Sequence, residues 1–376
     1  MHVLVVNAGS SSLKLSLLDG DRRVASTTVE RWEGAGHLEP VRAFVDPLRD
    51  VEAVGHRVVH GGQRYDGPVL VDDAALDYLD SLAELAPLHN PRCVAGIREV
   101  RRLLPDLPMV ACFDTAFHAA MPAAARTYAL PREWNRRWSL RRYGFHGLSH
   151  AYAARRAAEI VGLPVSQLRM VCCHLGAGAS LAAVRYGAAV DTTMGFTPLA
   201  GLVMATRSGS LDPGLLLWLL RSGRVDGATL SDVLENGSGL KGLSGTTGDL
   251  RDVLRLRSEG DPDAALAYDV FTHRLRREIG AMAASAHGLD LLVMTGGIGE
   301  HSPEVRASVC GQLGHLGVAI DTEVNAATQG DADLTAVGAA ARTVVVTAAE
   351  DVQIAREVRG LLGRGTKVTS TRAGRL

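Results

Sequence analysis

Short runs of hydrophobic residues recur along the chain and alternate with longer stretches rich in Ala, Leu and Arg. The runs have the length of buried strands, whereas the longer stretches, such as 151–161 and 264–287, are typical of helices. In chain order the strand-like runs read HVLVV, KLSLL, AVGHRVVH, PMVACF, RMVCCHL, LLVMTGG and RTVVVTAA. Strands that alternate with helices predict an α/β fold.

The segment SSSLKLSLLDG at 10–20 has the period of two that marks a strand with two different faces. Ser10, Ser12, Lys14 and Ser16 would line one face, and leucines the other. Lys14 is one of only three lysines among 40 basic residues, and a compact ammonium suits a phosphate oxygen. The preceding Gly-Ser turn lacks the spacing of a P-loop. From these residues alone, an ordinary turn and a phosphate-binding turn are about equally supported.

The pattern at 3–18, VLVVNAGSSSLKLSLL, recurs at 171–186 as VCCHLGAGASLAAVRY. Each copy contains a strand, a Gly-rich turn, a Ser-Leu pair and a second strand. This repetition predicts a duplicated α/β domain. If the two halves face each other across a cleft, the backbone amides of both turns would form a nest for the phosphates of one nucleotide.

Length, charge and cysteine content narrow the class of protein. At 376 residues the chain exceeds the ~250–300 residues at which a single core stops growing, so we expect two domains. A formal net charge of −1 gives no reason to expect nucleic acid or an anionic membrane as a partner. The five cysteines form no C-x-x-C pair, which favours free buried thiols. Because the first strand begins almost at Met1 and no apolar run could span a bilayer, we expect a cytoplasmic protein.

Polar residues directly follow several of the predicted strands. Asp114 follows PMVACF, His174 ends VCCH, Glu300 closes LLVMTGGIGE, and Glu350 with Asp351 follows RTVVVTAA. In open α/β sheets the ligand binds beyond the carboxyl ends of the strands, so this placement indicates a site. For either of the last two acids alone, a helix N-terminus that attracts negative charge is the simpler explanation.

Histidine and arginine occur in three dense motifs, GHRVVHGG, RRYGFHGLSH and GFTPLAGLVMATRSGSLDPG. The first carries Arg57, and the third carries Arg207 in a loop crowded with Gly, Ser and Pro. His146 and His150 of the second motif are four residues apart, as zinc ligands on a helix can be. Neither an H-E-x-x-H motif nor a suitable cysteine spacing accompanies them, so we do not expect zinc.

Ten motifs occur in a fixed order over essentially the whole chain. They are VLVVNAGSSSLK, HRVVHGG, APLHNP, FDTAFH, YGFHGLSH, HLGAGAS, MGFTPLAGLVMATRSGSLDP, DLRDV, TGGIGEHSPEVR and EDVQIAR. Together they resemble the acetate kinase family, within the superfamily of acetate and sugar kinases, Hsp70 and actin. The resemblance implies duplicated actin-like (ribonuclease H-like) domains with an active-site cleft between them. It places an N-terminal domain at 1–115 plus 351–376, closed by the C-terminal helix, and a C-terminal domain at 116–350 with the nucleotide site and the interface of a homodimer.

The same resemblance assigns roles to individual residues. Asp114, His146 and Arg207 match the catalytic positions, and Asn7 and Glu350 match the magnesium site. Arg57 matches the arginine that binds the substrate carboxylate, and the substrate pocket falls on Val59, Leu88, His89, Phe145 and Pro198. The nucleotide-binding positions fall on Ser10, Ser12, Lys14, His174, Leu175, Gly176, Ala177, Gly178, Asp249, Leu250, Arg251, Gly297, Ile298, Gly299, Glu300 and His301.

The implied reaction is the reversible transfer of a phosphoryl group from ATP to acetate, giving acetyl phosphate and ADP, with Mg²⁺ (or Mn²⁺) as cofactor. Such a reaction brings two anions together, and two arginines with a metal ion suppress their repulsion. Acetate is already ionised and needs no strong base. We therefore expect Asp114 to position acetate, metal-bound water or Arg57 rather than to remove a proton, and His146 to hydrogen-bond the phosphoryl group in flight.

Five residues depart from the family pattern. Ala177 replaces an asparagine that faces the phosphates, Ser210 replaces an aspartate beside Arg207, and Leu148 replaces a threonine. Gly296 and His301 replace alanine and asparagine. The core charges remain, so we expect activity with an altered rate or phosphate-donor preference.

Three other functions stay open. Propionate or another short acid is the nearest alternative, because one methylene changes binding by only ~1–3 kcal/mol. A sugar or glycerol kinase would need carboxylates and amides for hydroxyl groups, whereas the motifs offer arginines and aliphatic residues. A nucleotide-gated interaction protein on the same fold would leave the paired arginines and Asp114 without a purpose.

Overall fold

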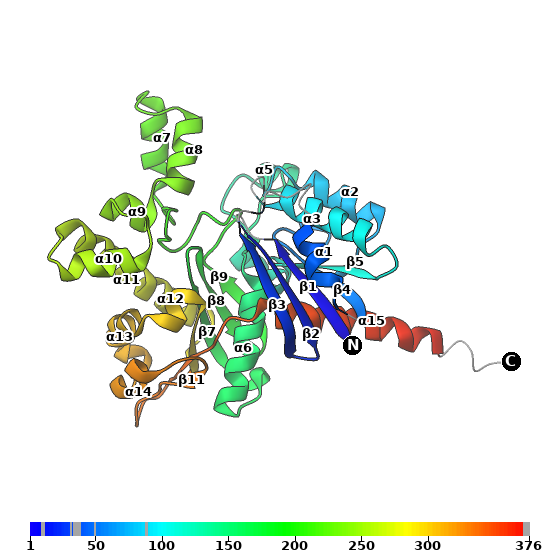
Figure 1. The fold of residues 1–376 in the computed structure, drawn as a ribbon. Coiled ribbons are helices and arrows are strands. Elements are labelled where there is room, and N and C mark those ends of the chain that lie inside the picture. Colours follow the sequence, from blue (N-terminus) through cyan, green and yellow to red (C-terminus); the bar gives the residue numbers. More distant parts are fainter. Residues whose placement is uncertain (9–11, 31, 33–38, 49, 87–88, 371–376) are drawn as a thin grey trace. The chain divides into compact units, whose positions relative to one another are not determined.

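The computed structural model describes residues 1–8, 12–30, 32, 39–48, 50–86 and 89–370, with side chains up to residue 363. The chain divides into two compact units (Figure 1). The first unit comprises Met1–Ala119, Phe145–Tyr152 and the chain from Ala349 onward, and the second comprises Ala120–Gly144 and Ala153–Ala348. The domain boundaries expected from the sequence stay a prediction. The short segment Phe145–Tyr152 packs with the first unit.

A mixed sheet lies at the centre of the first unit. Its strands are β1 (His2–Ala8), β2 (Ser12–Asp19), β3 (Arg22–Glu30), β4 (Val51–Val58), β5 (Val69–Leu70) and β6 (Met109–Phe113). Their order is β3-β2-β1-β4-β6-β5. β2 runs antiparallel to β1 and β3, whereas β1, β4 and β6 are parallel. The carboxyl ends of these three parallel strands therefore share one edge of the sheet.

The second unit contains a sheet of the same design. Its strands are β7 (Arg169–Leu175), β8 (Ala179–Arg185), β9 (Ala188–Thr192), β10 (Leu291–Thr295), β11 (Ala332–Asp333) and β12 (Arg342–Val345), in the order β11-β12-β10-β7-β8-β9. Read from β9, this order and the strand directions repeat those of the first sheet. The predicted α/β class and the predicted duplication are confirmed, with β1–β2 and β7–β8 as the repeated pairs.

Helices cover both faces of the first sheet, which explains its continuous apolar strands. Helix α15 (Glu350–Ser370) packs against β1, β2, β4 and β6, where Ile354 and Val358 are buried with Val3 and Val5. The opposite face has a second core that contains Leu4, Val6, Leu13, Leu15 and Trp32. β1, β2, β4 and β6 thus send residues into two different cores.

One sequence-based expectation for β2 is wrong. Lys14 is exposed between two buried leucines, as the alternation requires, but Ser16 is only 8% exposed and Leu18 is fully buried. The physical reason is α15, which covers the face on which these residues lie. The predicted polar surface is therefore limited to the start of β2.

The helices predicted at 151–161 and 264–287 are confirmed as α6 (Gly147–Val161) and α11 (Pro262–Ser285). α11 begins where Asp261 accepts a hydrogen bond from Ala264 N, with Pro262 in the first turn. The remaining helices are α1 (Glu39–Val45), α2 (Asp73–Ser81), α3 (Asn90–Leu103), η1 (Ala116–His118), α4 (Ala123–Arg126), α5 (Arg132–Arg137), η2 (Val165–Gln167), α7 (Pro213–Arg221), α8 (Gly227–Asn236), α9 (Gly239–Ser244), α10 (Leu250–Ser258), α12 (Gly296–His301), α13 (Pro303–Cys310), η3 (Gly314–Leu316) and α14 (Thr322–Ala327).

Two global expectations can be compared with these elements. All five cysteines are free and buried, as predicted. Throughout the described part of the chain, no helix has both the length and the apolar character needed to cross a membrane.

Candidate active site

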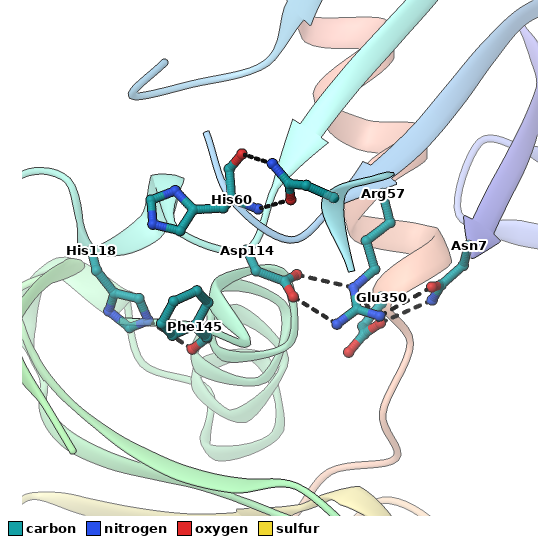
Figure 2. A network of polar contacts seen from close by, with 8 residues as sticks. Asn7, Arg57, His60, Asp114, His118, Phe145 and Glu350 are labelled. Atoms are coloured by element: carbon teal, nitrogen blue, oxygen red, sulfur yellow. Dashed lines mark hydrogen bonds and ion pairs between the residues drawn. The ribbon is translucent and has the colours of Figure 1, made fainter. Parts of the chain in front are cut away.

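Arg57 lies at the centre of a polar network in the first unit (Figure 2). Its Nη2 and Nε donate to the two carboxylate oxygens of Asp114 at 2.6 and 3.1 Å, and its Nη1 donates to Asn7 Oδ1 at 3.2 Å. Asn7 Nδ2 donates to Glu350 Oε2 at 3.0 Å, and Arg57 Nε lies 3.8 Å from the same oxygen. One guanidinium therefore links two carboxylates and an amide.

The topology explains why these four side chains meet. Asn7 lies near the end of β1, Arg57 near the end of β4, and Asp114 directly follows β6. Because the three strands are parallel neighbours, their carboxyl ends meet at one edge of the sheet. Glu350 is the first residue of α15, whose apolar face packs against the same sheet. Four of the site residues predicted from the sequence are thus brought together within one unit.

Burial and charge act against each other in this network. Asp114 is 1% exposed, and burial raises the pKa of its carboxyl although the Arg57 guanidinium pulls it down. For Arg57, burial alone would lower the pKa, but the attraction of Asp114 and Glu350 outweighs it and the pKa is raised. Arg57 therefore stays charged, and one cation faces two acids.

Asn90 holds the backbone that follows β4, where Val59 lies. Its Oδ1 accepts from His60 N and its Nδ2 donates to His60 O, both at 3.1 Å, and its side chain is fully buried. The His60 ring meets Phe145 edge-on, with ring centroids 5.6 Å apart. Val59 and Phe145, two of the predicted pocket residues, are therefore buried on one hydrogen-bonded frame. The sequence reasoning did not single out Asn90, although the APLHNP motif contains it.

His118 supports Phe145 from the other side. Its Nε2 lies 3.0 Å from the carbonyl oxygen of Phe145, and burial lowers the pKa of His118 to about 4 (Figure 2). The ring is therefore neutral near pH 7 and donates its Nε2 proton to this carbonyl. His118 lies in the FDTAFH motif but was not singled out, because burial was its only distinguishing feature and the sequence does not report burial.

The backbone at His146 is strained. Its φ is +57°, a left-handed conformation that costs a non-glycine residue roughly 1–3 kcal/mol and is often found at functional sites. The next residue, Gly147, donates its N–H to the carbonyl oxygen of Asp114 at 2.8 Å, and a Cβ on Gly147 would lie 2.2 Å from that oxygen. Only glycine allows α6 to begin against Asp114, and this contact brings the backbone of His146 next to the network. Leu148, the departure from threonine, is buried in the core under α15.

In the second unit, residues 176–178 connect β7 to β8, the strand pair that corresponds to β1 and β2. Gly176 N donates to Gly178 O at 3.1 Å, and Ala177 between them is exposed. Ala177 O accepts from Ala205 N at 3.1 Å, which ties this turn to the loop that carries Arg207. In the sheet, His174 of β7 lies opposite Ser180 of β8 and Thr295 of β10, and Leu175 is buried.

Helix α12 carries the predicted nucleotide residues Gly297, Ile298, Gly299, Glu300 and His301. It begins directly after β10 at Gly296, whose φ is +78° and whose added Cβ would lie 2.7 Å from Leu175 O. This close approach explains why glycine suits a position where alanine was expected. The buried guanidinium of Arg306, which the sequence reasoning did not single out, donates to Gly299 O and Glu300 O at 3.0 and 2.7 Å and so holds the end of α12.

Arg207 is held by a residue that no motif contained. Its Nε lies 3.2 Å from Oε2 of Glu235 on α8, and its Nη1 donates to Pro198 O at 3.4 Å. Ser210, where an aspartate was expected, instead accepts from Gly201 N at 2.9 Å through its Oγ.

The predicted nucleotide segment 249–251 forms the start of α10. Asp249 caps this helix by accepting from Arg251 N at 2.9 Å, and the pKa of Asp249 is lowered chiefly by its side-chain hydrogen bond with Arg251. The Arg251 side chain is 89% exposed, and Leu250 is buried.

The remaining predicted residues lie in the first unit. Ser12 begins β2, Lys14 faces Asn7 across the β1–β2 ladder, and His89 precedes α3. Ser10 and Leu88 lie outside the described residues. In the part of the chain that the structure describes, no group of three or more His, Cys, Asp and Glu side chains is arranged to hold a metal ion.

The sequence profile of the acetokinase family matches residues 39–356. The chain belongs to the acetokinase family. The acetate kinase of Gloeobacter violaceus is 49% identical over 95% of this chain and 98% of its own length, and that of Synechococcus sp. (strain JA-2-3B'a(2-13)) is 45% identical over 96% and 99%.

Solved structures of acetokinases agree with this assignment. The acetate kinase of Porphyromonas gingivalis matches with a TM-score of 0.89 at 34% identity, covering 96% of this chain and 99% of that one. A propionate kinase from Francisella tularensis subsp. tularensis SCHU S4 matches with a TM-score of 0.87 at 34% identity, covering 95% and 98%. The predicted fold class, duplicated actin-like domains, is confirmed by these matches together with the two equivalent sheets.

Proposed function

We propose that this chain catalyses the reversible, Mg²⁺-dependent transfer of the γ-phosphoryl group of ATP to acetate. A carboxylate oxygen of acetate attacks the γ-phosphorus in line, the bond from phosphorus to the bridging oxygen breaks, and ADP leaves with that oxygen and its electron pair. Membership of the acetokinase family and full-length similarity to proteins named acetate kinase support the reaction. The structural observation that carries the proposal is the half-buried Arg57 guanidinium between Asp114 and Glu350.

Arg57 provides the positive charge for the acid substrate. Its guanidinium is planar and rigidly oriented by Asp114, and a second carboxylate can share such a fork through the donors not used by the first. Because the raised pKa keeps Arg57 protonated, the attraction for acetate does not depend on pH over the physiological range.

Asp114 acts by orientation. Its two oxygens are occupied by Arg57 at hydrogen-bond distance, and acetate already carries the electron pair that attacks phosphorus. A base would have no proton to remove. Asp114 therefore fixes the direction of the Arg57 fork, and through its backbone oxygen it also anchors the residue next to His146.

Arg207 and His146 are proposed to stabilise charge on the phosphoryl oxygens during transfer. Arg207 supplies a second guanidinium, with its Nε directed toward Glu235. His146 supplies a ring nitrogen from a strained backbone position, as expected of a group that must be aimed precisely at a ligand.

Asn7 and Glu350 fit a magnesium ion that keeps most of its water. Mg²⁺ takes one or two protein carboxylates together with substrate phosphates and water, rather than a cage of protein ligands. Asn7 Nδ2 and Glu350 Oε2 are 3.0 Å apart, so the two side chains lie together, beside a network with more acids than cations. When bound there, the ion would neutralise charge on the phosphoryl oxygens. Mn²⁺ shares the preference for oxygen ligands.

Propionate is the second candidate acid, because a protein named propionate kinase matches the chain about as well as the acetate kinase structure does. Val59 and Phe145 would line the apolar part of the pocket. Discrimination by one methylene is worth only ~1–3 kcal/mol, so both acids are expected to react at different efficiencies. We further propose that the protein acts as a homodimer, as the resemblance implies, and that it is cytoplasmic.

Trapping of acyl phosphate with hydroxylamine tests the proposal. Purified protein is incubated with Mg-ATP and acetate, propionate or butyrate in parallel, and the hydroxamate is measured. Acetate is expected to give the highest kcat/KM and butyrate the lowest. Release of phosphate from ATP without any hydroxamate would contradict a carboxylate acceptor and favour a nucleotide-gated role.

A further inference from the structure

The loop that carries Arg207 is tied to the end of α8 on both sides of the arginine. Thr206 Oγ1 donates to the backbone oxygen of Glu235 at 2.8 Å, and Ser208 N donates to the backbone oxygen of Leu234 at 3.2 Å. The main chain at Arg207 therefore cannot shift without moving α8 or breaking these bonds.

Close packing at the start of α9 reinforces this attachment. Gly239 has a φ of +62°, and a Cβ built on it would lie 2.2 Å from Met204 O and 2.7 Å from Arg207 O. The backbone of the loop thus lies directly against the α8–α9 connection. These contacts hold the backbone at Arg207 without using the side chain of Arg207 or that of Glu235.

The direction of the guanidinium is a separate matter. Its Nε is 3.2 Å from Glu235 Oε2, while the bond from Nη1 to the Pro198 oxygen is long at 3.4 Å. The two charged side chains are 21 and 24% exposed, so water screens them less than a surface pair. The contact with Glu235 is therefore at Nε, the inner nitrogen of the guanidinium. A guanidinium held through Nε presents its Nη atoms to a ligand.

Glu235 also takes the place of an expected carboxylate. The family resemblance led us to expect an aspartate at position 210, beside Arg207, and Ser210 instead binds the backbone of Gly201. In this chain the acid that faces Arg207 comes from α8, 28 residues after the arginine in the printed sequence.

We propose that Glu235 is a positioning residue for phosphoryl transfer. It holds Arg207 through Nε so that the two Nη atoms are directed at the phosphoryl oxygens; this inference rests on the proposed function. Glu235 acts through Arg207 and touches neither substrate. Its side chain can be changed without removing the main-chain ties, because Thr206 binds the backbone oxygen of Glu235 and not its carboxylate.

The test compares Glu235→Gln, Glu235→Ala and Glu235→Asp with Arg207→Met and with the double variant Glu235→Gln/Arg207→Met. Glu259→Gln is the matched control, because it breaks an Arg–Glu pair with Arg255 on the exposed side of α10. Hydroxamate formation gives kcat and the KM for acetate and ATP, and urea unfolding reports the fold of every variant.

Loss of the Glu235 charge is expected to lower kcat about 10- to 100-fold, as for a misplaced catalytic group, with both KM values changed less. Glu235→Asp should recover part of the rate, and Glu259→Gln should keep all of it. In the Arg207→Met background, Glu235→Gln should cost nothing further, because its effect passes through Arg207.

Two results overturn the inference while the proposed function stands. In the first, the wild type is active and Glu235→Gln and Glu235→Ala have the same kcat as the wild type. In the second, Glu235→Gln lowers kcat by the same factor whether Arg207 is present or replaced. The second result would show that Glu235 serves only the fold. A wild type that makes no acyl phosphate from any acid overturns the proposed function, and this inference with it.

Discussion

Replacement of Arg57 by methionine tests the buried charge network without any reference to substrate. The change keeps much of the aliphatic volume and removes the guanidinium. Asp114, 1% exposed, then loses both of its hydrogen bonds from Arg57, and Asn7 Oδ1 loses one. Glu350 loses the cation 3.8 Å away. Asp114 and Glu350 would then both lack the positive charge that Arg57 provides.

The cost follows from what a buried ion pair is worth when one member is removed, about 3–5 kcal/mol. The side chain of Arg57 is 16% exposed, so water can enter the gap and solvate part of the charge that is left. We therefore expect the lower end, a loss of about 3 kcal/mol in the free energy of unfolding at pH 7.5.

This loss should depend on pH. Burial raises the pKa of Asp114, and Arg57 is the main influence that lowers it, so its removal raises the pKa further. A carboxyl with a higher pKa in the folded state than in the unfolded state binds more protons when folded, so stability grows as pH falls. The difference between wild type and variant should shrink by about 1.4 kcal/mol for each pH unit below the raised pKa.

Urea unfolding followed by circular dichroism at pH 7.5 and 5.5 measures both quantities. Arg102→Met is the matched control, because Arg102 is 68% exposed and pairs only with Glu99 among the described acids, so it should cost about 0–1 kcal/mol at either pH. An Arg57→Met loss no larger than that of Arg102→Met, and equal at both pH values, would refute the claim that Arg57 neutralises a buried acid.

Three further predictions address the frame around the site. Gly239→Ala should lower kcat at least about 10-fold, because its Cβ would displace the Arg207 loop. Gly223, the control, has a φ of +65° and open space around it, so Gly223→Ala should lower only the stability of the fold. Equal kcat values for the two variants would contradict this prediction. Asn90→Ala should destabilise the protein by about 1–3 kcal/mol in urea and raise the KM for acetate, since it removes two hydrogen bonds to the His60 backbone; an unchanged KM would separate this frame from the acid pocket. His56 is buried, and its pKa in the folded protein is lowered to about 3, whereas in the unfolded chain it takes up a proton below pH ~6.5. The free energy of unfolding should therefore fall as the pH falls from ~6.5 to about 3. His56→Leu should flatten that slope in acid unfolding, and an unchanged slope would count against the assignment.

Much of the fold could be predicted because the hydrophobic pattern of each strand and the order of the strands can be read in the sequence. The runs HVLVV and RMVCCHL became β1 and β7, and their repetition predicted the duplicated sheet. Asp114 could be placed at the site edge of the sheet because it directly follows a strand, whereas the role of Arg57 came from the family resemblance. The inferences on the sheets and on Asp114 use only local period and the direction of strands.

The parts that were missed depend on contacts between distant segments. Glu235 faces Arg207 across 28 positions, and no periodic pattern relates the two. Three of the missed residues use their side chains to contact backbone atoms elsewhere in the chain; they are Asn90, His118 and Arg306. Because every residue has backbone atoms, the residue types do not reveal which positions are in contact. Ser16 was assigned to a polar surface because the helix that buries it, α15, lies more than 330 residues later in the chain.

The most direct test of the central claim is ³¹P NMR of purified protein with Mg-ATP and acetate, with Arg57→Ala and Arg207→Ala measured alongside. The account predicts that the γ-phosphate signal of ATP is replaced by those of acetyl phosphate and ADP, that added ADP reverses the change, and that both variants lose the conversion. Release of inorganic phosphate with no acetyl phosphate, or full conversion by either variant, would contradict it.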